Sequence, residues 1–519
     1  MAKLFRSLRA TYLAADPRSL ALFRVGFALL LLADLAHRYQ GLDLWYTNSG
    51  LLPNHTLLWR PPAEHMFSLF FLASSRAEAQ LGFAVCALVY VCFGLGYRTR
   101  WSHAAALICR VSLNSRLAVL ENGGDMVMNI LCIFTLALPL GQRFSIDAWR
   151  ASLRPSPLTA ADDPNRPVHS LAMAGLIIQF ALIYFFNVLS KQGDAWSNGE
   201  AVHYALHLDK FVTPLGVWMR ESSPPQALRL MTRSVLVTEW LGFALLITPV
   251  FKDIARAIAI LVMPALHLSF ALGLDLGLFS PAMIAFYPLL ITRAHWDLLA
   301  LRLGQHVEQP APQVTRMRLT RLLPELAVAA LIFAIATEIV NDNTSVPEHW
   351  RWPRTTWTRA VIEYPRLLQG WRMFAPNAPQ EDSMIYIDAT TARGERIDPY
   401  NQAASRIANP VADLVPQQLD QSQFFTMYSD RIAYPSFAPY RQALHEWLLA
   451  HPTRTGQRED CLLSYDAYLI VDASPAFGSQ TPKPLKRERF LYYRTPKEDP
   501  CQKLQPTQDQ RIAQAPSSP

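Results

Sequence analysis

A short stretch that follows a long apolar run contains the side chains best suited to chemistry. Residues 190–211 read SKQGDAWSNGEAVHYALHLDKF and include Lys191, Asp194, Trp196 and two histidines. Ionisable groups at the end of a membrane span are costly unless they are solvated or functional. We therefore expect the membrane part of the chain to fold around a pocket at Lys191 and Trp196.

Lys191 has two interpretations. An amine at the end of a span can extend its ammonium group to the membrane interface and have no further role. Alternatively, an amine that is shielded from water gives up its proton more readily and can act as a base. In the same way, Trp196 can wall such a pocket or belong to the aromatic belt of the interface.

The histidines of this region also have alternative roles. His203 and His207 are four residues apart, so a helix would place both imidazoles on one face, but no third ligand is evident and no metal is expected. His267 lies in the apolar stretch MPALHLSFALGLDLGLFS, where a buried imidazole can either pack or react. The chain has no G-x-S-x-G, H-E-x-x-H or C-x-x-C motif, so hydrolase, zinc-protease and thioredoxin chemistry have no support.

The composition indicates a membrane protein. The 519 residues are 51% hydrophobic with a net charge of +7, and the apolar residues are clustered in runs. No basic stripe is interleaved with aromatic residues, so no nucleic-acid partner is expected. The basic N-terminus, MAKLFRSLRATYLAADPRS, has no small-residue cleavage site and leads into an apolar run, which predicts an uncleaved first span.

The apolar runs predict a polytopic α-helical bundle with about nine spans. These are residues 19–36, 79–97, 102–120, 124–140, 171–189, 232–251, 254–274, 276–291 and 323–341. The run at 102–120 contains arginines and asparagine, so it must face protein or a wet cavity. Residues 41–73 are rich in Trp and Tyr and indicate an interfacial or re-entrant segment.

The positive charges predict the orientation. With a cytoplasmic N-terminus, about seventeen Lys and Arg residues fall in inside segments and about seven in outside loops. The linker 306–321 is then cytoplasmic, and the chain beyond residue 341 is extracytoplasmic. We expect a transmembrane domain at 1–341, an extracytoplasmic α+β or β-rich domain at 342–505 and a disordered tail at 506–519.

The polar tail contains the patterns of a small domain. MIYIDATTARGERID, AYLIVDAS and FLYYR alternate like strands, and RQALHEWLLAH has the pattern of a helix. Cys461 and Cys501 are the two cysteines of this tail. Because an extracytoplasmic compartment is usually oxidising, we expect them to form a disulfide.

The predicted topology places several polar residues on one side of the membrane. His267 lies about two-thirds of the way along a span that runs from inside to outside, so its depth is compatible with the same region. The other residues on the outer side are Asn122, Asp125, Lys191, Asp194, Trp196 and His203.

At these residues the chain resembles the HTTM (horizontally transferred transmembrane) family, whose best-understood relative is the vitamin K-dependent γ-carboxylase. The resemblance covers about residues 18–300, which makes 1–341 an HTTM-like domain, and it reaches the tail at GWRMFAPNAP. Four further stretches carry it: LDLWYTNSGLLP, LENGGDMVMNILCIFTLALPLGQRFSIDAW, YFFNVLSKQGDAWSNGEAVHYAL and HLSFALGLDLGLFS.

The resemblance implies roles for two residues. In the carboxylase, a lysine five residues before a tryptophan is regarded as the base that activates a reduced quinone, and Lys191 has this relation to Trp196. The carboxylase also has a histidine ten residues before a turn glycine, and His267 has this relation to Gly277. Lys191 and His267 are therefore the candidate catalytic residues. Trp196, Asn122, Asp125, Asp194 and His203 are candidates for the quinone pocket.

The chain departs from the carboxylase at three places. An Asn-His pair of the carboxylase is Asn122-Gly123 here, and a histidine after the conserved Trp-x-Met is absent from Phe374-Ala375-Pro376. The large propeptide-binding region of the carboxylase has no clear counterpart in this shorter tail. These departures leave glutamate carboxylation in doubt.

Two functions agree with these observations. The first is an enzyme in which Lys191 deprotonates a reduced quinone of the vitamin K type, for epoxidase- or carboxylase-type lyase chemistry on a glutamyl-containing protein or peptide. The second is a non-catalytic membrane scaffold that binds lipids or a partner, with the extracytoplasmic domain as its recognition module. An amine that points into an apolar cavity favours the first. An amine in bulk water, or one paired with Asp194, favours the second.

Overall fold

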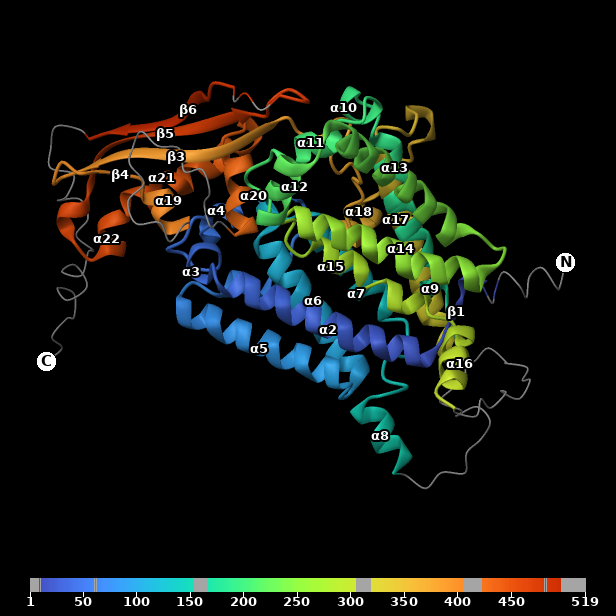
Figure 1. Ribbon diagram of the computed structural model, residues 1–519. Helices are drawn as coiled ribbons and strands as arrows, with labels where there is room; N and C mark the ends of the chain where they lie inside the picture. The colour runs from blue at the N-terminus through green and yellow to red at the C-terminus, as the bar shows by residue number, and fades with distance from the viewer. Residues whose placement is uncertain are drawn as a thin grey trace, which may run out of the picture.

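The computed structural model describes residues 11–59, 63–153, 167–304, 319–404, 422–479 and 483–495, with the single residues 9, 61 and 481. Figure 1 shows a bundle of helices with a small sheet and its covering helices at one end. The predicted disordered tail 506–519, most of the linker 306–321 and Cys501 lie outside the described residues.

Within the described residues, six helices are long and apolar enough to cross a membrane. They are α2 (Pro17–Tyr39), α5 (Arg76–Leu95), α9 (Leu171–Ser190), α13 (Pro225–Ile247), α14 (Lys252–Gly273) and α17 (Leu319–Asp342). Because each helical residue rises by about 1.5 Å, a helix of this length matches the roughly 30 Å hydrocarbon core of a bilayer.

The other predicted spans form shorter or more polar helices, so the expected number of about nine is not confirmed. The C-terminal half of α6 (Thr99–Arg116), which carries Arg110 and Arg116, is buried in the bundle, as these arginines require. α7 (Gly123–Thr135) has only 13 residues, which rise about 20 Å. The predicted span 276–291 is divided between α15 (Phe279–Ile284) and the 3-10 turn η3 (Tyr287–Leu290).

Shorter elements connect and cover these helices. They are α3 (Leu42–Trp45), α4 (Asn54–Trp59), η1 (Leu69–Leu72), η2 (Ala118–Leu120), α8 (Ile146–Ser152), α10 (Asp194–Ser197), α11 (Ala201–Leu206), α12 (Pro214–Ser222), α16 (Arg293–Arg302), η4 (Glu348–Trp350) and α18 (Thr356–Glu363). Strand β1 (Ala14–Ala15) pairs antiparallel with β2 (Val168–His169) and so joins the start of α2 to the start of α9.

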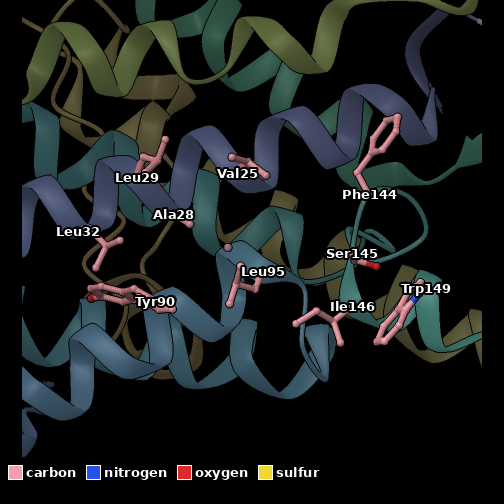
Figure 2. A pocket seen from close by; sticks show the side chains of 12 residues that line it. Val25, Ala28, Leu29, Leu32, Tyr90, Leu95, Phe144, Ser145, Ile146 and Trp149 are labelled. Carbon is pink, nitrogen blue, oxygen red and sulfur yellow. The ribbon is translucent and has the colours of Figure 1, made fainter.

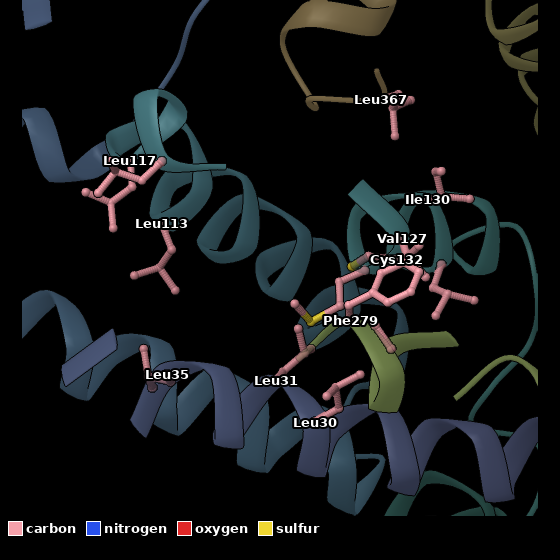
Figure 3. Close-up of a cluster of buried hydrophobic side chains, with 14 of the residues drawn as sticks. Leu30, Leu31, Leu35, Leu113, Leu117, Val127, Ile130, Cys132, Phe279 and Leu367 are labelled. Atoms are coloured by element: carbon pink, nitrogen blue, oxygen red, sulfur yellow. The ribbon is translucent and has the colours of Figure 1, made fainter. Parts of the chain in front are cut away.

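The core of the bundle is built around α9. This helix buries most of its side chains and packs against α7, α13 and α17. α2 packs along α5, and an apolar groove lies between them (Figure 2). Figure 3 shows how side chains from distant parts of the chain meet in the core. The residues labelled there are Leu30, Leu31, Leu35, Leu113, Leu117, Val127, Ile130, Cys132, Phe279 and Leu367.

The C-terminal region has the α+β architecture expected from its patterns. Its antiparallel sheet has the order β4-β3-β5-β6 and is formed by β3 (Glu381–Thr391), β4 (Arg396–Ile397), β5 (Leu462–Ala473) and β6 (Lys486–Arg494). Its helical elements are α19 (Pro399–Ala404), α20 (Gln423–Ile432), η5 (Pro435–Tyr440), α21 (Arg441–Leu449), α22 (His451–Thr455) and η6 (Arg458–Asp460). Ile385, Ile387 and Ala389 alternate along β3 on its buried face, which is the period that the sequence predicts.

Contacts between distant parts of the chain are found at both ends of the bundle. At the end that carries the sheet, Lys210 pairs with Asp430 at 2.6 Å, and Arg431 donates to the carbonyl of Glu121 at 2.7 Å. These partners belong to loops that we predict to be extracytoplasmic. At the other end, where Figure 1 shows β1, α8 and α16, Thr292 donates to Asp253 at 2.8 Å. Which end faces the cytoplasm stays a prediction.

The two-ended arrangement gives the orientation a direct test. A reporter that is active only in the cytosol should be silent when it is fused after Pro519, and it should be active when it is inserted after Gly304 at the opposite end. The paired insertion controls for expression of the fusion. A signal from the Pro519 fusion alone would invert the orientation and place the candidate site at the cytoplasmic face.

The predicted disulfide can be tested by counting thiols. Cys86, Cys92, Cys109 and Cys132 are free, and the chain has 6 cysteines in all. If Cys461 and Cys501 are bonded, alkylation of the denatured, unreduced protein should label four thiols, and reduction beforehand should add the other two. Six labelled thiols without reduction would exclude the bond.

Candidate functional site

Lys191 is buried and forms an ion pair within the bundle. It follows the last residue of α9, and its backbone N–H still donates to the carbonyl of Val188 at 3.2 Å. The ammonium group donates to both carboxylate oxygens of Glu239, at 2.5 and 2.6 Å. Since only 4% of the Lys191 side chain is exposed, the amine does not extend to the interface. Its partner is Glu239 of α13, and not Asp194.

Two further side chains hold this pair. The amide nitrogen of Asn187 donates to Glu239 Oε1 at 2.7 Å. The Lys191 ammonium lies 4.6 Å from the centre of the Trp196 ring, which is a cation–π arrangement. Trp196 is buried and lies against this pair. Its role as the wall of a pocket stays a prediction.

The segment GWRMFAPNAP of the C-terminal region closes the site. The backbone N–H of Met373 donates to Asn187 Oδ1 at 3.0 Å, and the Trp196 indole N–H donates to the carbonyl of Phe374 at 2.7 Å. The N–H of Gly193 donates to the carbonyl of Pro376 at 2.9 Å. Two stretches that carry the family resemblance, about 180 residues apart in the sequence, therefore meet at Lys191.

His267 of α14 contacts α9 through the hydroxyl group of Tyr184. Its Nε2 is 2.8 Å from the hydroxyl of Tyr184, which is 2.7 Å from the hydroxyl of Tyr287. The Nδ1 atom of His267 is buried and has no hydrogen-bond partner among the described residues. The rings of Phe270 and Phe279 lie 5.8 and 5.7 Å from the imidazole. The arrangement leaves one imidazole nitrogen available in an apolar setting.

Asn122 and Asp125 hold the start of α7. Asn122 accepts from the backbone N–H of Gly124 at 2.8 Å, and Asp125 accepts from the N–H of Asn122 at 3.1 Å, which forms a capping box. Asp125 also accepts from Arg38 and Arg110, which both pair with Asp34. All four charged side chains are buried, so two carboxylates and two guanidinium groups neutralise one another inside the bundle.

Gly123 lies between this turn and the His267 region. A Cβ atom at Gly123 would lie 3.3 Å from the ring of Phe279 and 3.6 Å from Met373 Sδ. Because the Phe279 ring also contacts His267, a side chain at position 123 would face the same wall. Gly123 therefore packs closely against Phe279 and Met373, and a larger side chain at this position would require Phe279 to shift.

Asp194 and His203 have environments that differ from that of Lys191. Asp194 is exposed in α10. His203 is buried in α11, where its Nε2 is 3.1 Å from the carbonyl of Pro475 and its ring lies 4.2 Å from that of His207. Burial lowers the pKa of both histidines, that of His207 to about 4. Their described contacts tie α11 to the C-terminal region, and a role in a quinone pocket stays a prediction.

The sequence interpretation missed Glu239, Asn187 and Tyr184. The first has a clear signal, because an isolated acid within the apolar run TEWLGFALLI is a site candidate by itself. The other two also have one, since Tyr184, Asn187 and Lys191 follow at spacings of three and four residues and so share one face of α9. The sequence indicated the buried ion-pair cluster of Asp34, Arg38, Arg110 and Asp125 only in part, through the polar character of residues 102–120.

The ion pair predicts how variants of Lys191 and Glu239 unfold. Lys191→Met leaves the Glu239 carboxylate buried without its counter-charge, so the free energy of unfolding should fall by about 3–5 kcal/mol. Lys191→Met with Glu239→Gln removes both charges and should recover most of that loss. Denaturation in detergent measures both, as a double-mutant cycle. Additive losses in the double variant would show that the two side chains do not stabilise each other.

One family model matches the part of the chain that contains this site. The family model of the HTTM domain matches residues 12–296, which is more than half of the chain and includes Lys191, Trp196, Glu239 and His267. No curated protein and no solved structure shows significant similarity to the chain. The apolar helices and the family match together indicate an integral membrane protein. The chain belongs to the HTTM domain family.

Proposed function

We propose that this protein is an enzyme that binds a reduced quinone beside Lys191 and His267 and removes a proton from it, for oxygen-dependent chemistry related to that of the γ-carboxylase. The observation that carries the proposal is the buried Lys191–Glu239 pair under the Trp196 ring. An ionisable amine in this position is expensive to keep in a membrane bundle, which favours a functional reason for it.

The residues present fit a ligand of this kind. A reduced quinone has a flat apolar ring with hydroxyl groups, so it needs apolar walls and a few polar atoms without other partners. Phe270, Phe279 and Trp196 are aromatic side chains next to His267 or Lys191. Buried polar atoms without a hydrogen-bond partner among the described residues include His267 Nδ1, Ser190 Oγ and Ser280 Oγ. When bound, a reduced quinone supplies the electrons for the reduction of oxygen.

The Lys191–Glu239 pair takes up the ligand's proton on Lys191, after the ammonium has passed its own proton to the Glu239 carboxylate. The pair then consists of ammonium beside carboxylic acid, a unit with one positive charge. That charge would stabilise a negative charge on a ligand oxygen nearby. Asn187 keeps the carboxylate in place through its amide group.

His267 is suited to orient a hydroxyl group of the ligand. The Tyr184 hydroxyl engages Nε2, which leaves Nδ1 to donate or accept. This role requires no charge change on the imidazole, as is appropriate for a group enclosed by Phe270 and Phe279. A glutamyl-containing protein or peptide is the second substrate that the carboxylase relationship suggests. Gly123 and the segment Phe374-Ala375-Pro376 lack the two carboxylase histidines, so we limit the proposal to the quinone step.

A non-catalytic scaffold is the second candidate, and one observation favours it. The Lys191 ammonium group already donates to both carboxylate oxygens of Glu239. A buried ion pair with a purely structural role is satisfied in the same way. In that case the bundle would hold lipids or a partner protein, and the C-terminal domain would provide recognition. The two candidates differ in whether the proton of Lys191 must move.

Lys191→Arg separates these candidates. Arginine can keep the ion pair with Glu239, but it cannot release its proton at any workable pH. Oxygen-dependent turnover of a reduced naphthoquinone should therefore fall by a factor of about 10² or more, as for loss of a general base, while the protein remains folded. Lys210→Arg is the matched control, because Lys210 pairs with Asp382 and Asp430 away from the site and should keep full turnover.

The quinone-binding step is measured in the same preparations. Wild-type turnover in Lys191→Arg would remove Lys191 as a base. If the wild type neither turns over nor binds the reduced naphthoquinone, the scaffold becomes the better function. Purified Lys191→Arg with normal melting and normal quinone binding, but no turnover, is the result that the proposal expects.

A further inference from the structure

An apolar groove lies far from Lys191, between α2 and α5. Leu29 and Leu32 of α2 and Leu95 of α5 lie along it, and Phe144, Ile146 and Trp149 form its end (Figure 2). Its volume is about 610 Å³. From Val25 to Leu32 the wall formed by α2 rises about 10 Å. The groove is lined mainly by apolar side chains.

The groove opens where the protein meets the hydrocarbon of the bilayer. Val25, Leu29, Val91 and Leu95 are exposed, and all belong to helices long and apolar enough to span a membrane. Ser145 also lines the groove, but its hydroxyl already donates to the carbonyl of Gly141 at 2.6 Å. Apart from the buried hydroxyl of Tyr90, a polar ligand would find few hydrogen-bond partners there to replace its hydration, whereas a hydrocarbon chain would lose nothing.

The end of the groove is held in shape by Arg24. This side chain is fully buried, and it donates to the carbonyls of Gly94 at 3.2 Å and Leu140 at 2.7 Å, as well as to those of Arg143 and Phe144. Phe144 has a left-handed φ of 47°, a conformation that costs energy and is retained only where its surroundings impose it. The groove is therefore formed by the fold itself.

Basic and aromatic side chains surround this end. Arg143 and Arg150 immediately flank the lining segment 144–149, and the Arg150 guanidinium lies 4.9 Å from the centre of the Tyr97 ring. The acid of this segment, Asp147, accepts from the backbone N–H groups of Arg98 and Thr99 at 2.9 and 2.7 Å. Trp149 is 62% exposed, and an exposed tryptophan at the end of a bundle is typical of headgroup depth.

We infer that this groove binds an anionic phospholipid. One acyl chain lies between α2 and α5, and the phosphate lies among Arg98, Arg143 and Arg150. The charges match, because arginines bind phosphate through charge-assisted hydrogen bonds. The depth also matches, because the apolar walls end where the arginines and Trp149 begin. This end of the bundle is the one that we predict to be cytoplasmic, and that leaflet is rich in anionic lipids.

The inference is tested with lipids of known composition. The full chain is reconstituted in nanodiscs of phosphatidylcholine with a minor fraction of phosphatidylglycerol, extracted in mild detergent, and its retained lipids are quantified by mass spectrometry. The wild type should retain phosphatidylglycerol in preference to phosphatidylcholine. Arg143→Gln with Arg150→Gln should reduce that preference about thirtyfold, as expected for two basic residues at an anionic membrane surface.

Two further variants make the result specific. Arg9→Gln with Arg302→Gln removes the same charge from exposed arginines elsewhere and should retain phosphatidylglycerol normally. Leu29→Trp fills the exposed wall of the groove and should reduce retention while leaving the melting temperature unchanged. Three results would each overturn the assignment. The two arginine pairs could lose phosphatidylglycerol equally, or Leu29→Trp could have no effect. The wild type could also retain phosphatidylcholine or an isoprenoid quinone in place of phosphatidylglycerol.

Discussion

A charged group inside a membrane bundle needs an opposite charge or hydrogen-bond partners, and two buried clusters of opposite charges organise the described fold. The cost of an unpaired buried charge is several kcal/mol, comparable to the whole stability of many proteins. Here Asp34, Arg38, Arg110 and Asp125 form a closed set across α2, α6 and α7. Lys191 and Glu239 do the same for α9 and α13. These pairs fix which helices are neighbours, because each partner is acceptable in the interior only beside the other.

The two sets differ in what they can do. The cations of the first set are arginines, which keep their protons under all physiological conditions, so this set can only hold structure. The second set pairs a lysine with a glutamate, and both can exchange protons. It also lies beside His267 and Tyr184, whose hydrogen bonds leave Nδ1 of the imidazole without a described partner. The capacity for proton transfer is therefore concentrated at one place in the bundle, where α9 ends.

Local patterns predicted the parts of this protein that depend on local sequence. The alternating tail sequences form β3 and β5, RQALHEWLLAH forms α21, and the family predicted from the motifs is the one whose model matches residues 12–296. The sequence could not show that Glu239 reaches Lys191, because the pair joins two helices 48 residues apart. Nor could apolar runs show that α7 has only 13 residues, since its length is set by the Asn122 cap and by packing against α15. The lipid-facing groove likewise depends on the tertiary contacts of Arg24.

The departures from the carboxylase pattern border the residues of the site. Gly123 faces Phe279 and Met373, and the segment 374–376 contributes the carbonyls that bind Trp196 and Gly193. Phe279 in turn lies 5.7 Å from His267, and Asn187 and Glu239 hold Lys191. Shape and proton transfer depend on different side chains, so a change at position 123 alters the packing against Phe279 and Met373 without altering the Lys191–Glu239 pair.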